Sequence, residues 1–126
     1  MIIDTSVLVD IDRGDNIGRI DKINNENHSI SSATLMELST GRYLNNTAES
    51  EFRKLFRNLE IIPIDAEIAD RAGKIMAQLI QDGERIEIND VYIAATAIKT
   101  SKPILTGNTK HFKKLDEIET INWNKL

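Results

Sequence analysis

The sequence predicts an α/β fold in which helices cover both faces of a central, mostly parallel sheet of four or five strands. Short apolar runs alternate with helical patterns, and most of these runs end in polar residues that can start a helix. The chain also has no repeat and no Pro/Gly/Ser-rich linker, and 126 residues suit one compact domain. We therefore expect residues 1–126 to form a single α/β/α domain.

The expected strands are brief apolar segments bounded by polar or turn-forming residues. They are the apolar residues 1–3, which lead to Asp4, and residues 28–30, 59–62, 104–105 and 118–121. The expected helices carry apolar residues three and four positions apart. They are residues 5–13, 17–23, 32–41, 48–57, 65–82 and 89–98, followed by a turn and short helical piece in 107–112.

Small polar residues at the starts of these helices are candidate caps, because their side chains can accept a backbone N–H. The candidates are Thr5 or Ser6, Ser31 or Ser32, Asp65, and Asn89 or Asp90. Each follows a strand or a loop, as parallel strands connected by helices require. Gly41 is either a late helical residue or a helix stop.

Composition excludes several kinds of protein. The chain has no cysteine, which excludes disulfides and thiolate metal sites. It shows no signal-peptide pattern, and no apolar run approaches the ~18–20 residues needed to cross a bilayer. We expect a cytoplasmic protein with no membrane partner.

The formal net charge of −4 argues against nucleic-acid binding, since most nucleic-acid-binding domains carry a basic face. A carboxylate-rich site, however, counts as negative only until a metal ion fills it. Two segments, 52–57 and 99–114, are also locally basic. They are either solvated helix faces or parts of a basic patch, and the sequence leaves both interpretations open.

Polar side chains with oxygen atoms stand near several of the expected strand ends. Asp4 directly follows the first strand, Glu37 lies one to two turns into the next long helix, and Asp90 starts a later helix. Thr106 and Asn108 follow the 104–105 strand. Because function in parallel α/β sheets collects where strands end and helices begin, we expect these residues to meet at one place.

Such a cluster of carboxylates needs a counter-charge. Two carboxylates ~4 Å apart repel by about 4 kcal/mol at an effective dielectric of 20. An all-oxygen ligand set selects hard divalent ions such as Mg²⁺. Such an ion can activate water and neutralise charge on a phosphoryl transition state, which points to phosphodiester hydrolysis.

Four segments resemble the motifs of PIN-domain nucleases, in the family's order and over nearly the whole chain. They are residues 2–10 (IIDTSVLVD), 32–38 (SATLMEL), 89–97 (NDVYIAATA) and 105–112 (LTGNTKHF). Each motif alone is weak, but the four together are specific. The resemblance implies a three-layer α/β/α PIN-like sandwich.

The resemblance also implies roles for particular residues. Asp4, Glu37 and Asp90 would be the catalytic carboxylates and would hold Mg²⁺ or Mn²⁺. Ser6 and Thr106 would orient these carboxylates through hydrogen bonds.

Asn108 stands where the fully acidic version of the site has a carboxylate. It is either a catalytic-site residue or a turn former, and its neutrality puts a second bound metal in doubt. Asp116 is a weaker candidate for the missing acid.

By resemblance, the activity is that of a metal-dependent endoribonuclease that leaves a 5′-phosphate and a 3′-hydroxyl. A short PIN domain is similar to the VapC-type toxins of toxin–antitoxin pairs. The implied partners are an RNA substrate, a small antitoxin whose tail covers the acidic groove, and a second copy in a homodimer. The alternatives are a housekeeping RNA-processing nuclease and a non-catalytic PIN-like binding module.

A haloacid-dehalogenase-type phosphatase is a competing interpretation, because residues 7–12 (VLVDID) form an apolar run with an Asp-x-Asp pattern. That chemistry needs Asp10 as nucleophile and Asp12 as acid/base. The pattern normally continues with Thr or Val where this chain has Gly14, and it leaves Asp4 without a role. A response-receiver domain is weaker still, because no acidic pair follows the first strand.

Other residues have simpler interpretations. His28 and His111 are expected at the surface or in loops rather than in catalysis. The apolar side chains of 52–56 belong either to the core or to an interface. The acidic residues of 65–82, apart from the cap Asp65, are expected to be exposed on their helix.

Overall fold

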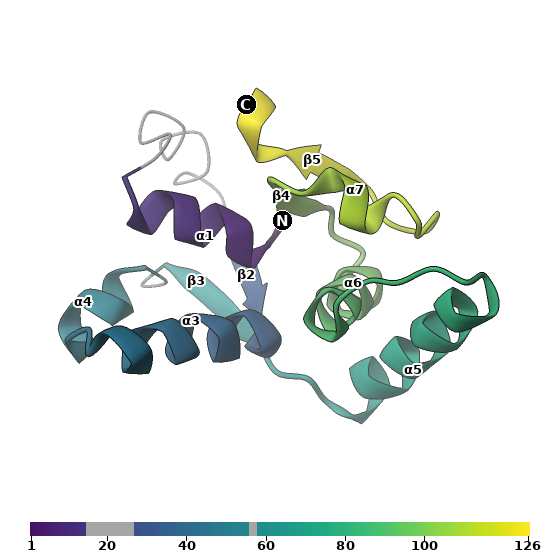
Figure 1. The fold of residues 1–126 in the computed structure, drawn as a ribbon, viewed down its shortest axis with the longest axis horizontal. Coiled ribbons are helices and arrows are strands. Elements are labelled where there is room, and N and C mark those ends of the chain that lie inside the picture. The colour runs from purple at the N-terminus through teal and green to yellow at the C-terminus, as the bar shows by residue number, and fades with distance from the viewer. Residues whose placement is uncertain (15–26, 56–57) are drawn as a thin grey trace.

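The computed structural model describes residues 1–14, 27–55 and 58–126 (Figure 1). The short helix expected over 17–23 lies outside these residues, as do the last two positions of the 48–57 segment. In the described part of the chain, no helix is long and apolar enough to cross a membrane.

A five-stranded parallel sheet forms the centre of the fold, as expected. Its strands run in the order β3-β2-β1-β4-β5, so the first strand of the chain is the middle one. The strands are β1 (Ile2–Ile3), β2 (His28–Ser31), β3 (Leu59–Ile62), β4 (Ile104–Thr106) and β5 (Thr120–Asn122). Because β1 and β4 pair in parallel, with Ile3 opposite Leu105, their carboxyl ends lie side by side.

Helices connect these strands and cover the sheet (Figure 1). They are α1 (Thr5–Asp12), α3 (Ser32–Asn45), α4 (Glu49–Lys54), α5 (Ala66–Gln81), α6 (Ile88–Thr100), α7 (Thr109–Phe112) and the 3₁₀ helix η2 (Trp123–Lys125). Gly41 is therefore an interior residue of α3 and not its stop. This arrangement confirms the predicted α/β/α architecture.

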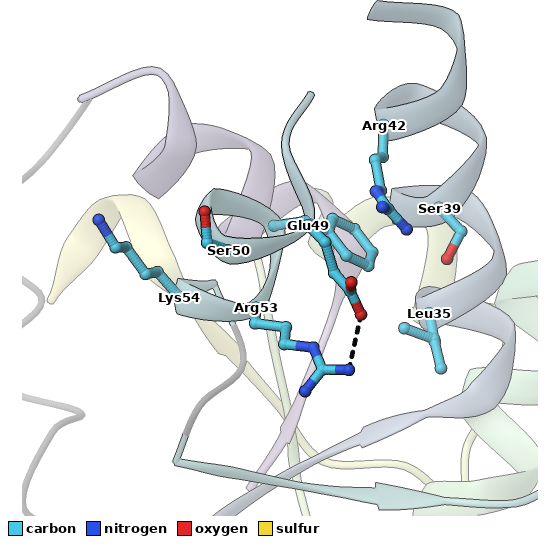
Figure 2. Close-up of a pocket in the computed structure, with 8 residues that line it drawn as sticks. Leu35, Ser39, Arg42, Glu49, Ser50, Arg53 and Lys54 are labelled. Atoms are coloured by element: carbon cyan, nitrogen blue, oxygen red, sulfur yellow. Dashed lines mark hydrogen bonds and ion pairs between the residues drawn. The ribbon is translucent and has the colours of Figure 1, made fainter. Parts of the chain in front are cut away.

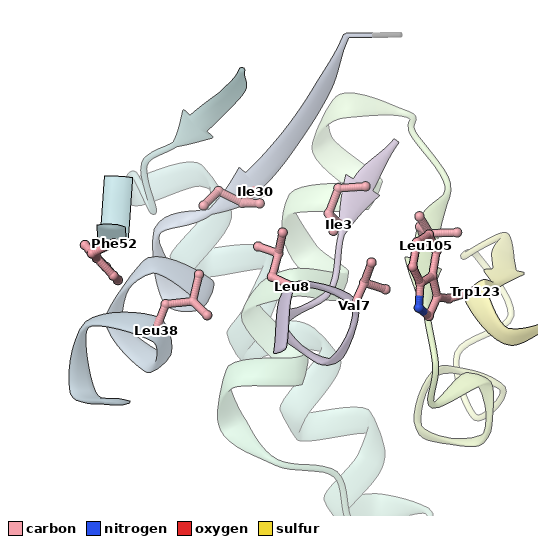
Figure 3. Close-up of a cluster of buried hydrophobic side chains, with 8 residues drawn as sticks. All are labelled: Ile3, Val7, Leu8, Ile30, Leu38, Phe52, Leu105 and Trp123. Carbon is pink, nitrogen blue, oxygen red and sulfur yellow. The ribbon is translucent and has the colours of Figure 1, made fainter. Parts of the chain in front are cut away.

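Successive side chains of β1 point to opposite faces of the sheet, which builds two separate cores. Ile3 packs in one core with side chains of α1, α3 and α4 (Figure 3). Ile2 packs in the other core with side chains of α6 and α7, such as Ile93 and Phe112. Since both residues are fully buried, β1 is held from both sides, and Asp4 leaves it in a defined direction.

The helix starts confirm two of the expected caps. Ser31 Oγ accepts the backbone N–H of Ala33 at 3.1 Å, and Asp65 Oδ1 accepts that of Ile68 at 2.8 Å. Asp65 also pairs with the Lys99 ammonium group, and this contact lowers the pKa of the Asp65 carboxyl.

Two other helix starts and one strand differ from expectation. The N-cap of α1 is Asp4 rather than Thr5 or Ser6, because both hydroxyls bind carboxylates instead. Helix α6 begins at Ile88, slightly earlier than Asn89 or Asp90. The last strand is β5 at Thr120–Asn122, two residues later than the start of the apolar segment 118–121.

The expectation for His28 is wrong, because the residue is buried in β2. Its Nδ1 lies 3.1 Å from the amino nitrogen of Met1, the residue that precedes the neighbouring strand β1. Phe52 is also buried and belongs to the core beneath α4, which decides its role in favour of packing.

Candidate active site

One pocket of about 590 Å³ lies at the carboxyl ends of the two central strands. It is lined by Asp4, Glu37, Asp90 and Asn108, the four residues that the sequence predicts for the site. They come from the end of β1, the middle of α3, the start of α6 and the loop after β4. We call this the acidic pocket.

Asp4 is the most firmly held of the three carboxylates. It is 4% exposed, and its Oδ2 accepts hydrogen bonds from Ser6 Oγ at 2.8 Å and from Thr106 Oγ1 at 2.7 Å. Its own N–H donates to the carbonyl of Leu105 at 2.9 Å. These contacts fix one carboxylate oxygen and leave the other for a ligand.

Glu37 is held by Thr5, whose hydroxyl donates to Oε1 at 2.8 Å. Burial raises the pKa of the Glu37 carboxyl, and the negative charges of Asp4 and Asp90 raise it further. The Thr5 hydrogen bond acts in the opposite direction. The pocket therefore disfavours the ionised form of Glu37, and a bound cation would favour the ionised form.

Asp90 lies in the first turn of α6 and faces His111 on α7. His111 Nδ1 is 3.0 Å from Asp90 Oδ2. Burial raises the pKa of the Asp90 carboxyl, with a further contribution from the charge of Asp4. The charge of Asp4 thus acts on both of the other carboxylates, as expected if the three share one site.

Asn108 immediately precedes α7 and is exposed in the acidic pocket. Its backbone N–H donates to Thr106 Oγ1 at 2.9 Å, while its side chain makes no capping hydrogen bond to α7. The side-chain amide of Asn108 can therefore contact a ligand in the pocket. Asp116, the alternative acid, lines a different cavity together with Arg71 and Lys74 and does not reach this pocket.

The donor set of the acidic pocket fits a hard divalent cation. Carboxylate and amide oxygens are the ligands that Mg²⁺ and Mn²⁺ prefer, and the raised pKa values record a need for positive charge. As the side chains stand, no three acidic or histidine residues among those described form a ready-made metal cluster. The carboxylates line the wall of the pocket rather than meeting at one point.

Sequence reasoning missed several residues of this pocket. Thr5 was expected as a helix cap but orients Glu37, and His111 was expected outside the site but contacts Asp90. Asp10 and Glu87 add further negative charge to the lining. The position of Thr5 next to Asp4 could have indicated its role from the sequence. The places of His111, Asp10 and Glu87 in the pocket depend on how α1, α6 and α7 converge, which the sequence does not show.

The phosphatase interpretation fails on the fold. Residues 7–9 belong to α1 and not to a strand, so Asp10 and Asp12 cannot follow a strand as the phosphatase chemistry requires. Asp4, which the phosphatase interpretation leaves without a role, instead lies at the end of β1, the middle strand of the sheet.

A larger pocket of about 700 Å³ lies between α3 and α4 (Figure 2). Both of its arginines are already engaged: Arg53 pairs with Glu49 at 2.6 Å, and Arg42 lies over the rings of Tyr43 and Phe52. We call this the α3–α4 pocket. It shares no lining residue with the acidic pocket.

The fold and the acidic pocket define a class of nuclease. The family model described as "PIN domain" matches residues 1–118, and the chain belongs to this family. PIN-domain nucleases generally depend on a divalent metal ion.

The sequence relatives show which members of the PIN-domain family this chain is similar to. It is 36% identical to Ribonuclease VapC1 of Methanocaldococcus jannaschii, over 93% of this chain and 82% of that protein. It is 32% identical to a Ribonuclease VapC of Rickettsia bellii, over 96% and 94% of the two chains. Within the PIN-domain family, the chain is thus one of the VapC ribonucleases.

A solved structure agrees with this placement. A chain in the crystal structure of VapBC2 from Rickettsia felis, bound to a DNA fragment from the promoter of its genes, has a TM-score of 0.81 to this chain. The two are 26% identical, with 97% of each chain covered. The fold of nearly the whole chain therefore has a counterpart in a solved complex.

Proposed function

We propose that the acidic pocket hydrolyses RNA phosphodiester bonds with Mg²⁺ or Mn²⁺, held by Asp4, Glu37 and Asp90. The supporting observation is that three carboxylates from distant segments line one pocket, where burial and the charge of Asp4 raise the pKa of both Glu37 and Asp90. Mg²⁺ typically keeps several waters and binds one or two carboxylates directly. A pocket whose carboxylates line its wall suits such a hydrated ion.

When bound, the ion supplies Lewis acidity and neutralises charge that develops on the phosphate. The chain's own contribution is positioning. Ser6 and Thr106 fix the orientation of Asp4, and Thr5 fixes that of Glu37. Asn108 offers a neutral amide at the rim, where it can contact a phosphate oxygen or a water.

The direct test compares the parent chain with Asp4→Asn on a mixed pool of RNA, with Mg²⁺ or Mn²⁺ and with EDTA. We expect cleavage only by the parent and only with metal, with 5′-phosphate ends on the products. Asp116→Asn is the matched control, since Asp116 lies in another cavity, and it should cleave like the parent. Equal cleavage by Asp4→Asn would refute the proposal, and a 2′,3′-cyclic phosphate would indicate attack by the ribose hydroxyl instead.

We further propose that the nuclease acts as the toxin of a toxin–antitoxin pair and that it forms a homodimer. The similarity to a chain of a VapBC complex supports a small protein partner. The exposed apolar side chains of Met36, Tyr43 and Leu44 on α3 support an interface with a second copy.

Induced expression of the parent should arrest growth of a bacterial host, whereas Asp4→Asn should not. Normal growth with active enzyme would favour a housekeeping role.

A further inference from the structure

A second groove adjoins the acidic pocket and is continuous with it. This groove of about 450 Å³ lies between the end of α5, the loop that leads to α6, and α7. Glu87 and His111 line both cavities. We call it the α5–α7 groove. A chain-like ligand that leaves the acidic pocket past His111 would therefore enter it directly.

The groove supplies further cations beside Arg13, which lines the acidic pocket. Arg85, Lys110 and Lys114 line the groove, against the carboxylates of Glu84 and Glu87. Lys114 pairs with Glu84 at 2.9 Å and donates to the carbonyl of Arg85. In the described parts of the chain, the side chains of Arg85 and Lys110 make no ion pair, and both are exposed. Two cations are thus available to an anionic ligand.

The same groove has an apolar side. Met76, Ile80 and Ile86 line it, and Ile80 is 70% exposed. The charged side and the apolar side of the α5–α7 groove therefore match the two parts of a nucleotide, a charged phosphate and a flat base. A site for a simple inorganic anion would not need the apolar side.

We infer that the α5–α7 groove binds the RNA strand next to the scissile bond, with Arg85 and Lys110 on a backbone phosphate and the apolar side against a base. This inference rests on the proposed RNA substrate and extends it to a second binding site. It also helps to explain how a chain with a net charge of −4 can hold RNA: Arg85 and Lys110 stand beside the acidic pocket and add to Arg13 within it.

The other basic segment is a poorer candidate. Arg53 is paired with Glu49, and Arg42 is stacked on aromatic rings in the α3–α4 pocket. That pocket has no residue in common with the acidic pocket, so it offers no direct path for a strand that is being cleaved. Of the two basic segments, only 99–114 contributes lysines, Lys110 and Lys114, to the α5–α7 groove.

The test measures binding of a fluorescent single-stranded RNA of mixed sequence to the whole chain in EDTA, where metal-dependent cleavage cannot occur. Lys110→Ala and Arg85→Ala are compared with the parent by fluorescence anisotropy over a series of salt concentrations. Each substitution should weaken binding about 3- to 10-fold and lower the slope of log K against log salt by about 0.7, as expected for one lost phosphate contact on a single strand. Lys110→Arg should retain the parent's affinity and slope.

Lys54→Ala is the matched control, because Lys54 is an exposed lysine of the α3–α4 pocket. It should bind RNA like the parent. The inference is overturned if Lys110→Ala and Arg85→Ala bind like the parent, if Lys54→Ala weakens binding equally, or if the parent shows no binding at low salt. It is also overturned if the groove variants change the oligomeric state, measured by light scattering, and leave RNA affinity intact.

Cleavage by the parent with Mg²⁺ is measured separately and tests the proposed function. If the parent cleaves RNA but Lys110→Ala and Arg85→Ala bind RNA like the parent, this inference fails and the proposed function stands. Groove-dependent binding without cleavage by the parent would remove the catalytic proposal and leave the groove as an RNA-binding site. The two failures are therefore distinguishable.

Discussion

The acidic pocket and the α3–α4 pocket differ in a way that volume does not capture. The α3–α4 pocket is the larger, at about 700 Å³ against about 590 Å³. Its two arginines are engaged locally, Arg53 by Glu49 and Arg42 by the rings of Tyr43 and Phe52. In the acidic pocket, hydroxyl groups hold Asp4 and Glu37, and the pKa of Glu37 is raised. Charge that the fold holds in place without neutralising it distinguishes a reactive site from a surface hollow.

The sharpest test of this comparison substitutes one charged residue in each pocket. Asp90→Asn should lower RNA cleavage at least about 100-fold, because even residues that only support metal ligands are worth about 10- to 100-fold. Arg53→Ala in the α3–α4 pocket should stay within about 2-fold of the parent. Initial rates at saturating Mg²⁺ measure both, and comparable losses would erase the distinction between the pockets.

The next effect concerns Thr106, which is fully buried and joins two parts of the acidic pocket. Its hydroxyl donates to Asp4 and accepts the N–H of Asn108. Thr106→Val keeps the shape but removes both bonds, so we expect a 10- to 100-fold loss of cleavage. The loss of stability should be about 1–3 kcal/mol.

Urea unfolding and cleavage assays measure these two effects of Thr106→Val. Thr40→Val is the control, because the Thr40 hydroxyl bonds to a carbonyl within exposed α3. Wild-type cleavage by Thr106→Val would show that Asp4 needs no orientation from β4.

A smaller effect concerns the metal-free protein and its dependence on pH. Since the pKa of Glu37 is raised on folding, the folded state binds this proton more tightly than the unfolded chain. Its contribution favours folding at low pH and is lost as pH rises from the ordinary carboxyl range through the raised pKa. In EDTA at neutral pH, Glu37→Gln should therefore melt at a higher temperature than the parent, because the variant has no carboxyl to ionise.

The advantage of Glu37→Gln should vanish at acidic pH, where the parent carboxyl is protonated. It should also be offset by added Mg²⁺, which stabilises the parent if it binds the folded state alone. Differential scanning fluorimetry across pH measures these shifts. A variant that is less stable than the parent at every pH would contradict the electrostatic account.

The smallest effect is expected in the α3–α4 pocket. Glu49→Ala removes the exposed pair with Arg53 and should cost less than about 0.5 kcal/mol, since solvent screens such pairs. Cleavage should not change. A larger cost in urea unfolding would mean that this pocket is held together by its charges.

The sequence predicted the order of the elements and the four residues that line the acidic pocket, because both follow local patterns. The position of Asp4 after an apolar run, and of Asn108 after the 104–105 strand, needs only strand polarity. The contact between His111 and Asp90 could not be predicted, because it depends on the angle at which α7 packs against α6. Burial of His28 was missed for a similar reason: its neighbour across the sheet is the amino terminus itself.

The hydrogen bond between Asp4 and Thr106 joins residues that are 102 positions apart. The orientation of Asp4 is therefore not complete until β4 has been synthesised and has docked beside β1. A nascent chain that ends before β4 has Asp4 and Ser6 but lacks the second hydroxyl that holds the carboxylate. Synthesis of this nuclease thus has a built-in delay, because the fully oriented carboxylate arises only after residue 106 has joined the sheet.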